Sequence, residues 1–209
     1  MEAKIPDLYR GDSDPQNKRK IHQLYNPNIN GGFSSSNLLI SNLNNSGNGK
    51  EIFNSPFHNL VIKHVGSEWH NTHFLSFSEC EERAKYYGSE GGKNYIPYIE
   101  GDIWGFFILT LSLNKLQNRE ISEIASGIYK VNYQTCLQEF NFQATILLIN
   151  VIKYFTYLLN ENVQFSETIF LNAKTDKEWL ILPVNSFSNQ YSFKIAADIV
   201  SKIEYYIFQ

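Results

Sequence analysis

Short runs of β-branched and aromatic residues recur along this chain, which is typical of a protein rich in β-strands. Strands are predicted at residues 7–10, 59–65, 72–76, 103–113, 128–133, 168–171, 178–183 and 202–208. In the C-terminal half these strands do not alternate regularly with helices. The sequence therefore predicts an α+β fold rather than a doubly wound parallel sheet.

Helical patterns are clearest in two segments. Ser78, followed three residues later by Glu81, matches a capping box, and the helix that it would open is expected to end at Gly88. Apolar residues recur at helical spacing across residues 143–160, which predicts a long helix there. A shorter helix is expected at residues 120–126.

Length and composition indicate one globular unit. The chain has 209 residues, 43% of them hydrophobic, so we expect a single domain over residues 1–209 with a buried core. Residues 42–50, rich in Asn and Gly, are predicted to be a mobile loop within it. A net charge of −3 argues against a protein that binds nucleic acid through charge alone. Two cysteines exclude a disulfide scaffold and a four-cysteine zinc site.

Nothing in the sequence predicts a membrane segment or a signal peptide. The N-terminus carries acidic residues and Pro6 where a signal peptide has an apolar run. The most apolar stretch, residues 140–159, is interrupted by polar residues and falls short of the roughly 20 apolar residues that a bilayer requires. We therefore expect a protein of the cytoplasm, of either the producing or a target cell.

Residues of metal-binding type gather between positions 64 and 80. They are His64, Glu68, His70, His73 and Cys80. If residues 72–76 form a strand, His70 lies in the loop before it while His73 points from one of its faces, so the side chains need not converge. We interpret them as surface or supporting residues and expect no metal.

Three separated segments each place charged or hydroxyl side chains beside a predicted strand. They are Asp7-Leu8-Tyr9-Arg10-Gly11-Asp12-Ser13-Asp14-Pro15, His73-Phe74-Leu75-Ser76-Phe77-Ser78 and Asp176-Lys177-Glu178-Trp179-Leu180-Ile181-Leu182-Pro183. Together they offer an arginine, two serines and two carboxylates.

These motifs, in this order, resemble those of the arginine–serine–glutamate class of mono-ADP-ribosyltransferases, the cholera-toxin-like group. The family has a Tyr-Arg-x-Asp-Ser strand first, a Ser-Thr-Ser strand leading into a helix second, and a Glu-x-Glu turn before an apolar strand third. In this chain Pro15 stands one place early and Asp176 replaces the first glutamate. Phe77 replaces the central threonine, which fits if its side chain faces the core.

The resemblance implies a fold and a reaction. The fold would be a split β-sandwich of two facing sheets, with flanking helices and an NAD-binding cleft. NAD would be the co-substrate, cleaved between nicotinamide and ribose through an oxocarbenium-like transition state akin to that of glycoside cleavage.

The resemblance also implies three catalytic residues. Glu178 would stabilise the positive charge that develops on the ribose. Ser76 would hold the Glu178 carboxylate in position. Asp176 would orient or deprotonate the acceptor.

Five residues are expected to bind NAD. Arg10 would bind the pyrophosphate, because a guanidinium donates to paired oxygens. Ser78 would cap the helix that follows its strand, and His58 stands about where relatives carry a histidine near the adenosine. Ser76 and Glu178 complete the set.

Three functions follow as alternatives. The first is a toxin or effector that modifies a protein, with arginine favoured as acceptor, or a nucleic acid. The second is an NAD glycohydrolase on the same fold, with water as the acceptor. The third is a non-enzymatic protein-binding module, which the aromatic content of 15% would suit. A toxin of this kind would be made beside an antitoxin or immunity protein, or delivered by a secretion apparatus.

Overall fold

The computed structural model describes residues 4–12, 55–68, 74–89, 98–99, 103–134, 143–183 and 200–207. The strands are β1 (Leu8–Asp12), β2 (Leu75–Ser78), β3 (Tyr98–Ile99), β4 (Ile103–Leu111), β5 (Gln117–Ala125), β6 (Ile128–Gln134), β7 (Gln143–Asn150), β8 (Glu178–Pro183) and β9 (Val200–Ile207). The helical elements are α3 (Ser55–Lys63), the π-helical turn η4 (His64–Glu68), α4 (Glu81–Gly88), the 3-10 turn η6 (Leu113–Lys115), α5 (Val151–Asn160) and α6 (Glu167–Asp176). The predicted mixture of helices and strands is confirmed.

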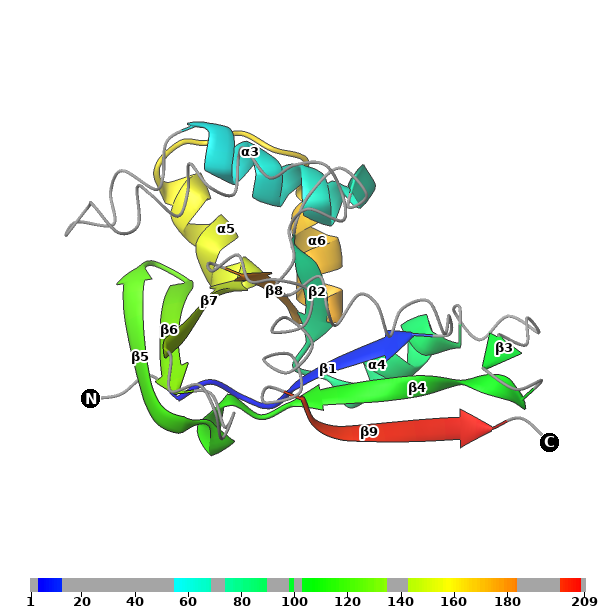
Figure 1. The fold of residues 1–209 in the computed structure, drawn as a ribbon. Coiled ribbons are helices and arrows are strands. Elements are labelled where there is room, and N and C mark those ends of the chain that lie inside the picture. The colour runs from blue at the N-terminus through cyan, green and yellow to red at the C-terminus, as the bar shows by residue number, and fades with distance from the viewer. Residues whose placement is uncertain are drawn as a thin grey trace.

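One antiparallel sheet joins all nine strands in the order β3-β4-β1-β2-β8-β7-β6-β5, with β9 also paired to β4. The contact between β1 and β2 is short, since it pairs Tyr9 with Ser78, whereas β1 is paired with β4 from Leu8 to Asp12. In Figure 1, β2 rises steeply from β1 at this point. The sheet therefore divides into a group of β1, β3, β4 and β9 and a group of β2, β5, β6, β7 and β8.

Side chains from both strand groups share one apolar cluster, called the central core here. It consists of Ile5, Leu8, Phe77, Leu111, Leu113, Leu116, Ile121, Tyr129, Val131, Tyr133, Ile146, Leu148, Trp179 and Ile181. Because β1 and β4 contribute to it together with β2, β5, β6, β7 and β8, the two groups pack on each other in addition to pairing along β1 and β2.

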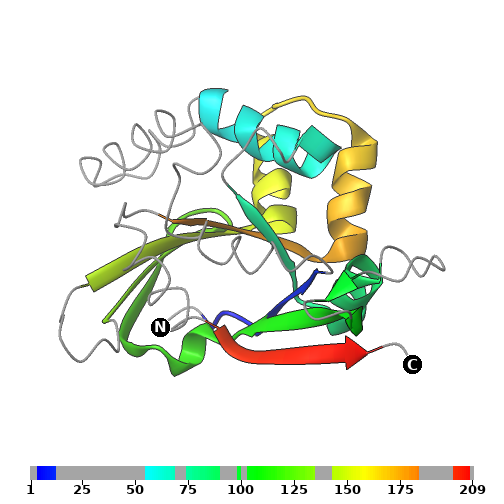
Figure 2. The same ribbon diagram turned by 45° about the vertical axis from the view of Figure 1, so that its right-hand side comes forward.

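The opposite face of the second group packs against helices. This helix-side core consists of Phe57, Val61, Val65, Phe74, Ile128, Leu147, Ile149, Val151, Tyr154, Phe155, Leu158, Ala173 and Leu180. Helices α3, α5 and α6 supply its outer layer, and Figure 2 shows them together on one side of the sheet. Within the described ranges, no helix is both long and apolar enough to cross a lipid bilayer.

The predicted long helix is wrong in its first half, which forms strand β7. Ile146 and Leu148 enter the central core, whereas Leu147 and Ile149 enter the helix-side core. A continuous apolar run fits either a buried helix or a strand that is covered on both faces, and here the two packed layers decide for a strand. Asn150 then caps α5, because its side chain accepts a hydrogen bond from the amide three residues later.

Three further predictions are wrong for related reasons. Residues 59–65 form α3 and the start of η4, and residues 168–171 lie in α6, although both were predicted as strands. Val61 and Val65 of the first segment and Ile169 and Phe170 of the second pack against the helix-side core, and this tertiary packing overrides strand propensity. Residues 120–126 lie in β5 and its turn rather than in a helix, since β5 pairs with β6 through a hairpin at Gly127, whose φ is 79°.

Each of the other predicted strands overlaps a strand of the structure. Strand β8 has the predicted bounds, and β1, β4, β6 and β9 overlap their predicted ranges closely. Strand β2 overlaps the predicted residues 72–76 from Leu75 onward. The predicted mobile loop, residues 42–50, lies outside the described residues.

Two glycines let α4 lie directly on the first strand group. A Cβ atom at Gly11 would stand 1.8 Å from the backbone oxygen of Ala84 in α4. One at Gly88, where α4 ends as predicted, would stand 2.6 Å from the Phe106 ring. This contact places α4 beside the C-terminal end of β2, where the candidate site lies.

Candidate active site

The three sequence motifs lie on three neighbouring strands, β1, β2 and β8. Ser76 is paired with Leu180, and Ser78 is paired with Glu178. Directly paired residues share a face of the sheet, so Ser76, Ser78 and Glu178 all face the helix side, where Leu180 packs. Phe77 points the other way into the central core. This is the orientation expected if phenylalanine replaces the central threonine of the family's Ser-Thr-Ser strand.

Ser76 is in contact with each of the other three residues of the site, Arg10, His64 and Glu178. The Nη1 of Arg10 donates a hydrogen bond to the backbone oxygen of Ser76 over 2.9 Å. The Nε2 of His64 lies 2.8 Å from the Ser76 hydroxyl oxygen. The Glu178 carboxyl shares a hydrogen bond with the same Ser76 side chain. Arg10, Ser76 and Glu178, predicted to act together, are therefore in direct contact through Ser76.

His64 is a site residue that the sequence did not single out for this role. It is the first residue of η4, 5% exposed, and its ring packs edge-on against Phe74 with 5.5 Å between ring centroids. Burial lowers the pKa of His64 to about 3, and the positive charge of Arg10 adds to this effect. The imidazole is therefore neutral at physiological pH.

The direction of the hydrogen bonds follows from the chemistry of these groups. A serine hydroxyl has one proton, and an ionised Glu178 can only accept hydrogen bonds. When Ser76 donates its proton to Glu178, its oxygen must accept from His64, which requires the tautomer with hydrogen on Nε2. The order of donation is then His64 to Ser76 to Glu178.

His58, the histidine predicted to lie near the adenosine, is a partly buried residue of α3. It precedes His64 by six positions, which on a helix is a rotation of about 120° away from the same face. Binding of NAD by His58 stays a prediction, whereas the contact of His64 with Ser76 is shown.

Glu178 is partly exposed and begins β8, directly after Lys177 in the left-handed conformation. The pKa of Glu178 is raised to about 7, chiefly by desolvation; the hydrogen bond from Ser76 opposes this rise, and the negative charge of Asp176 adds to it. A carboxyl with a strongly raised pKa, in contact with an arginine-bound serine, is the kind of group found at functional sites.

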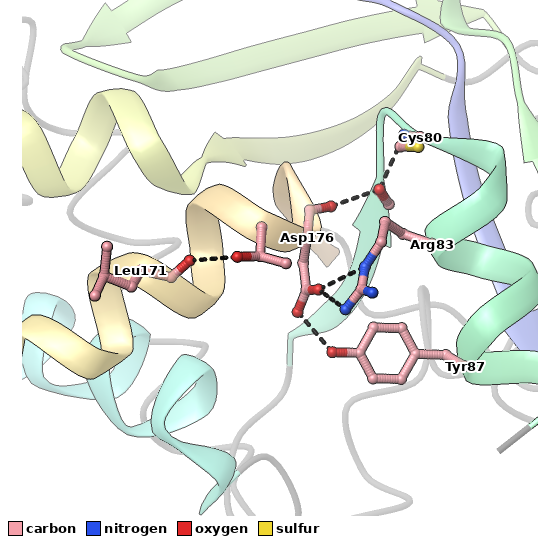
Figure 3. A network of polar contacts seen from close by, with 7 residues as sticks. Cys80, Arg83, Tyr87, Leu171 and Asp176 are labelled. Atoms are coloured by element: carbon pink, nitrogen blue, oxygen red, sulfur yellow. Dashed lines mark hydrogen bonds and ion pairs between the residues drawn. The ribbon is translucent and has the colours of Figure 1, made fainter. Parts of the chain in front are cut away.

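Asp176, the last residue of α6, is held by two side chains of α4 (Figure 3). The Nε and Nη2 of Arg83 lie 3.0 and 2.5 Å from Asp176 Oδ1. The hydroxyl of Tyr87 donates to Asp176 Oδ2 over 2.6 Å. Both carboxylate oxygens are thus hydrogen-bonded within the protein, and an action of Asp176 on an acceptor stays a prediction.

Ser78 joins the end of β2 to the end of α6. Its hydroxyl donates to the backbone oxygen of Asp176 over 2.5 Å and accepts from the amide of Cys80 over 2.9 Å. The predicted capping box is wrong in its position, because Cys80 is the N-cap residue and α4 begins at Glu81. Ser78 still satisfies an amide at the entrance to the helix, and its contact with NAD stays a prediction.

Arg83 and Tyr87 were not predicted as site residues. They stand four positions apart on the same face of α4, so both side chains can reach one partner. Among the residues that the structure describes, no group of three or more His, Cys, Asp or Glu side chains gathers as a metal site. His70 and His73 lie outside those residues.

Comparisons with models of known protein families, with curated proteins and with solved structures find no match to this chain.

Proposed function

We propose that this chain is a mono-ADP-ribosyltransferase of the toxin or effector kind, which uses NAD as co-substrate. The acceptor would be a macromolecule, either a protein side chain, with arginine favoured, or a nucleic acid. The observation that carries the proposal is the meeting of Arg10, Ser76 and Glu178, which come from distant parts of the chain and stand on adjacent strands. An antitoxin or immunity protein is part of the same proposal.

The fold that we propose is the split β-sandwich of ADP-ribosyltransferases. Two features support it: the short β1–β2 contact, at which the strand groups diverge, and the central core that both groups share. We place the NAD cleft where β1 and β2 part, because Arg10 and Ser76 stand on the two sides of that point.

The residues at this point have the chemistry that NAD requires. Arg10 can donate several N–H groups to paired phosphate oxygens, and its bond to the Ser76 carbonyl fixes the orientation of the guanidinium. Glu178 is an acid whose desolvated surroundings strengthen its electrostatic effect on a nearby positive charge. Bound NAD would supply the ribosyl group and nicotinamide as the leaving group.

The protein would act mainly by electrostatic stabilisation. The ionised Glu178 carboxylate would stabilise positive charge on the ribose, which is largest in the transition state. Ser76 would hold this carboxylate through its hydroxyl, and His64 would fix the direction in which that hydroxyl donates. Partial burial of Glu178 would limit the access of water to the reacting bond.

One observation favours the alternative of an NAD glycohydrolase. An acid two residues before Glu178 is expected to serve the acceptor, yet Asp176 is bound to Arg83 and Tyr87. Hydrolysis does not require a second carboxylate to orient a macromolecular acceptor, because water is the acceptor. Hydrolysis and transfer would share Arg10, Ser76 and Glu178, so the two functions differ only in the acceptor.

A serine beside a histidine is also the arrangement of an acyl-transfer nucleophile. Two features favour a positioning role for Ser76 instead. A His64 with a pKa of about 3 is a weak base at neutral pH, and the Ser76 hydroxyl is also hydrogen-bonded to Glu178. Labelling of Ser76 by a fluorophosphonate would contradict this assignment.

The experiment uses purified protein, a cell lysate and NAD labelled on the adenylate phosphate. Transfer predicts labelled macromolecules together with released nicotinamide, and treatment with protease or RNase then identifies the acceptor class. Nicotinamide release without labelled macromolecules would favour the glycohydrolase. Glu178→Gln should abolish either activity, whereas Glu161→Gln, at an exposed glutamate after α5, serves as the control. Absence of NAD turnover and of NAD binding by calorimetry, in a folded protein, would favour the binding module.

A further inference from the structure

The turn that precedes Glu178 is fixed from the side of β2 and α4. Lys177 adopts the left-handed conformation, with φ 46° and ψ 52°, between the end of α6 and the start of β8. The Ser78 hydroxyl donates to the backbone oxygen of Asp176, and the Glu79 amide donates to the backbone oxygen of Lys177 over 3.2 Å. Non-glycine residues rarely adopt this conformation, so surrounding contacts must maintain it.

The side chain of Asp176 adds the only ion pair described at this turn. Arg83 contacts Oδ1 through two nitrogens, Nε and Nη2, and hydrogen bonds between a guanidinium and a carboxylate are charge-assisted. Tyr87 donates to the other oxygen. The Asp176 side chain is 17% exposed and that of Arg83 is 27% exposed, so water screens this pair only in part.

Arg83 and Tyr87 are both suited to hold the Asp176 carboxylate in one orientation. The pKa of Tyr87 is raised to about 12, by desolvation first and then by Asp176, so the hydroxyl keeps its proton and remains a donor at neutral pH. Arg83 also lies over the Tyr86 ring, 4.5 Å from its centroid, and this contact does not involve the Tyr86 hydroxyl. Figure 3 shows Arg83 and Tyr87 reaching Asp176 together from one face of α4.

We propose that Asp176 is a positioning residue for Glu178, held in place by Arg83 and Tyr87, rather than a group that faces the acceptor. This inference rests on the proposed function. Asp176 ends α6 two residues before Glu178, so a displacement of its side chain moves the turn that carries the Glu178 carboxylate. Catalysis by a positioned carboxylate is sensitive to shifts of about 1 Å.

The test measures nicotinamide release with water as acceptor and label transfer to lysate, in parallel, for Asp176→Asn, Arg83→Gln and Tyr87→Phe. Each variant is expected to lower kcat for both reactions by the same factor, roughly tenfold or more, with KM for NAD unchanged. The double variant Arg83→Gln/Asp176→Asn should lose no more than either single variant, because both break one contact.

Tyr86→Phe is the matched control, since it removes a hydroxyl from the adjacent exposed tyrosine while keeping the ring beneath Arg83. It should leave both reactions at the wild-type rate. If Asp176→Asn lowers transfer but leaves nicotinamide release unchanged, Asp176 faces the acceptor and the inference is wrong. Wild-type kcat in Arg83→Gln and Tyr87→Phe would also overturn it.

Hydrogen exchange supplies a readout that does not depend on NAD. Backbone amides of residues 177–180 should exchange faster in Arg83→Gln than in Tyr86→Phe, because the turn loses its ion pair. Equal exchange in the two variants would overturn the inference whatever the activities are. A wild-type protein that neither releases nicotinamide nor transfers ADP-ribose would instead overturn the proposed function.

Discussion

The Nε2 of His64 lies 2.8 Å from the hydroxyl oxygen of Ser76, although 12 positions separate the two residues in the chain. This contact joins the π-helical turn after α3 to the strand that stands between β1 and β8. Single π-helical turns are frequent at functional sites, because they alter the direction of a helix end and of the side chains on it. Here the turn presents a buried, neutral imidazole to the hydroxyl that contacts Glu178.

His64→Leu should lower the rate of nicotinamide release, because Ser76 loses the partner that directs its proton to Glu178. We expect a loss in kcat of roughly tenfold, the equivalent of one hydrogen bond, with KM for NAD little changed. His64→Gln keeps an N–H donor of similar reach and should recover part of the rate. Steady-state kinetics of the two variants, with thermal unfolding as a check of the fold, decides the matter. Equal losses in both variants would contradict the orienting role.

Glu178 makes the folded protein less stable as the pH rises. Its pKa is about 7 in the folded protein, against about 4.3 in an unfolded chain, so between these values the native state holds a proton that the unfolded state has lost. Stability from this group is complete below about pH 4 and is lost as the pH rises to 7. Glu178→Gln should therefore be more stable than the wild type above pH 7, by up to about 4 kcal/mol.

Urea unfolding at pH 5, 6, 7 and 8 measures this difference. His64 has the opposite linkage, since its lowered pKa removes stability as the pH falls below about 6.5, and it is common to both proteins. The informative quantity is thus the gap between wild type and Glu178→Gln, which should widen with pH and level off above 7. A constant gap would show that Glu178 does not titrate in this range.

Activity should also depend on the ionisation of Glu178, but it should rise with pH, whereas stability falls. If ionised Glu178 stabilises positive charge, kcat/KM for nicotinamide release should rise with pH and level off above a midpoint near 7. Ser76→Ala removes a hydrogen bond that favours the ionised form, so its midpoint should move to higher pH. Asp176→Asn removes a nearby negative charge and should move the midpoint to lower pH. Profiles with the same midpoint in all three proteins would separate activity from Glu178.

Gly11→Ala should destabilise the protein, because the new Cβ would stand 1.8 Å from the backbone oxygen of Ala84. Backbone atoms of a packed helix cannot yield as a side chain can, so we expect a loss of about 1–3 kcal/mol or more. Gly66→Ala is the matched control, since its nearest contact is the flexible end of Ile169 at 3.1 Å. Urea unfolding of the two variants should show a large loss for the first and a small change for the second. A Gly11→Ala protein of wild-type stability would mean that α4 is not anchored on β1 at this point.

Local patterns in the sequence were sufficient for the strands that carry the motifs. The bounds of β8 follow from a short apolar run between Glu178 and Pro183, and the alternation of Ser76, Phe77 and Ser78 follows from the period of two along a strand; both depend only on neighbouring residues. The end of α4 at Gly88 was also predicted, although Gly88 does not adopt the left-handed conformation of a glycine cap. The motifs also indicated three residues, Arg10, Ser76 and Glu178, that stand on neighbouring strands.

Tertiary packing alone decided the remaining elements. The apolar run of β7 fits a helix or a strand equally well, and it became a strand because apolar layers cover both of its faces. The contact of His64 with Ser76 and the binding of Asp176 by Arg83 and Tyr87 join residues 12 and about 90 positions apart. No local pattern encodes such contacts, because they exist only after α3, α4 and α6 have packed against the sheet.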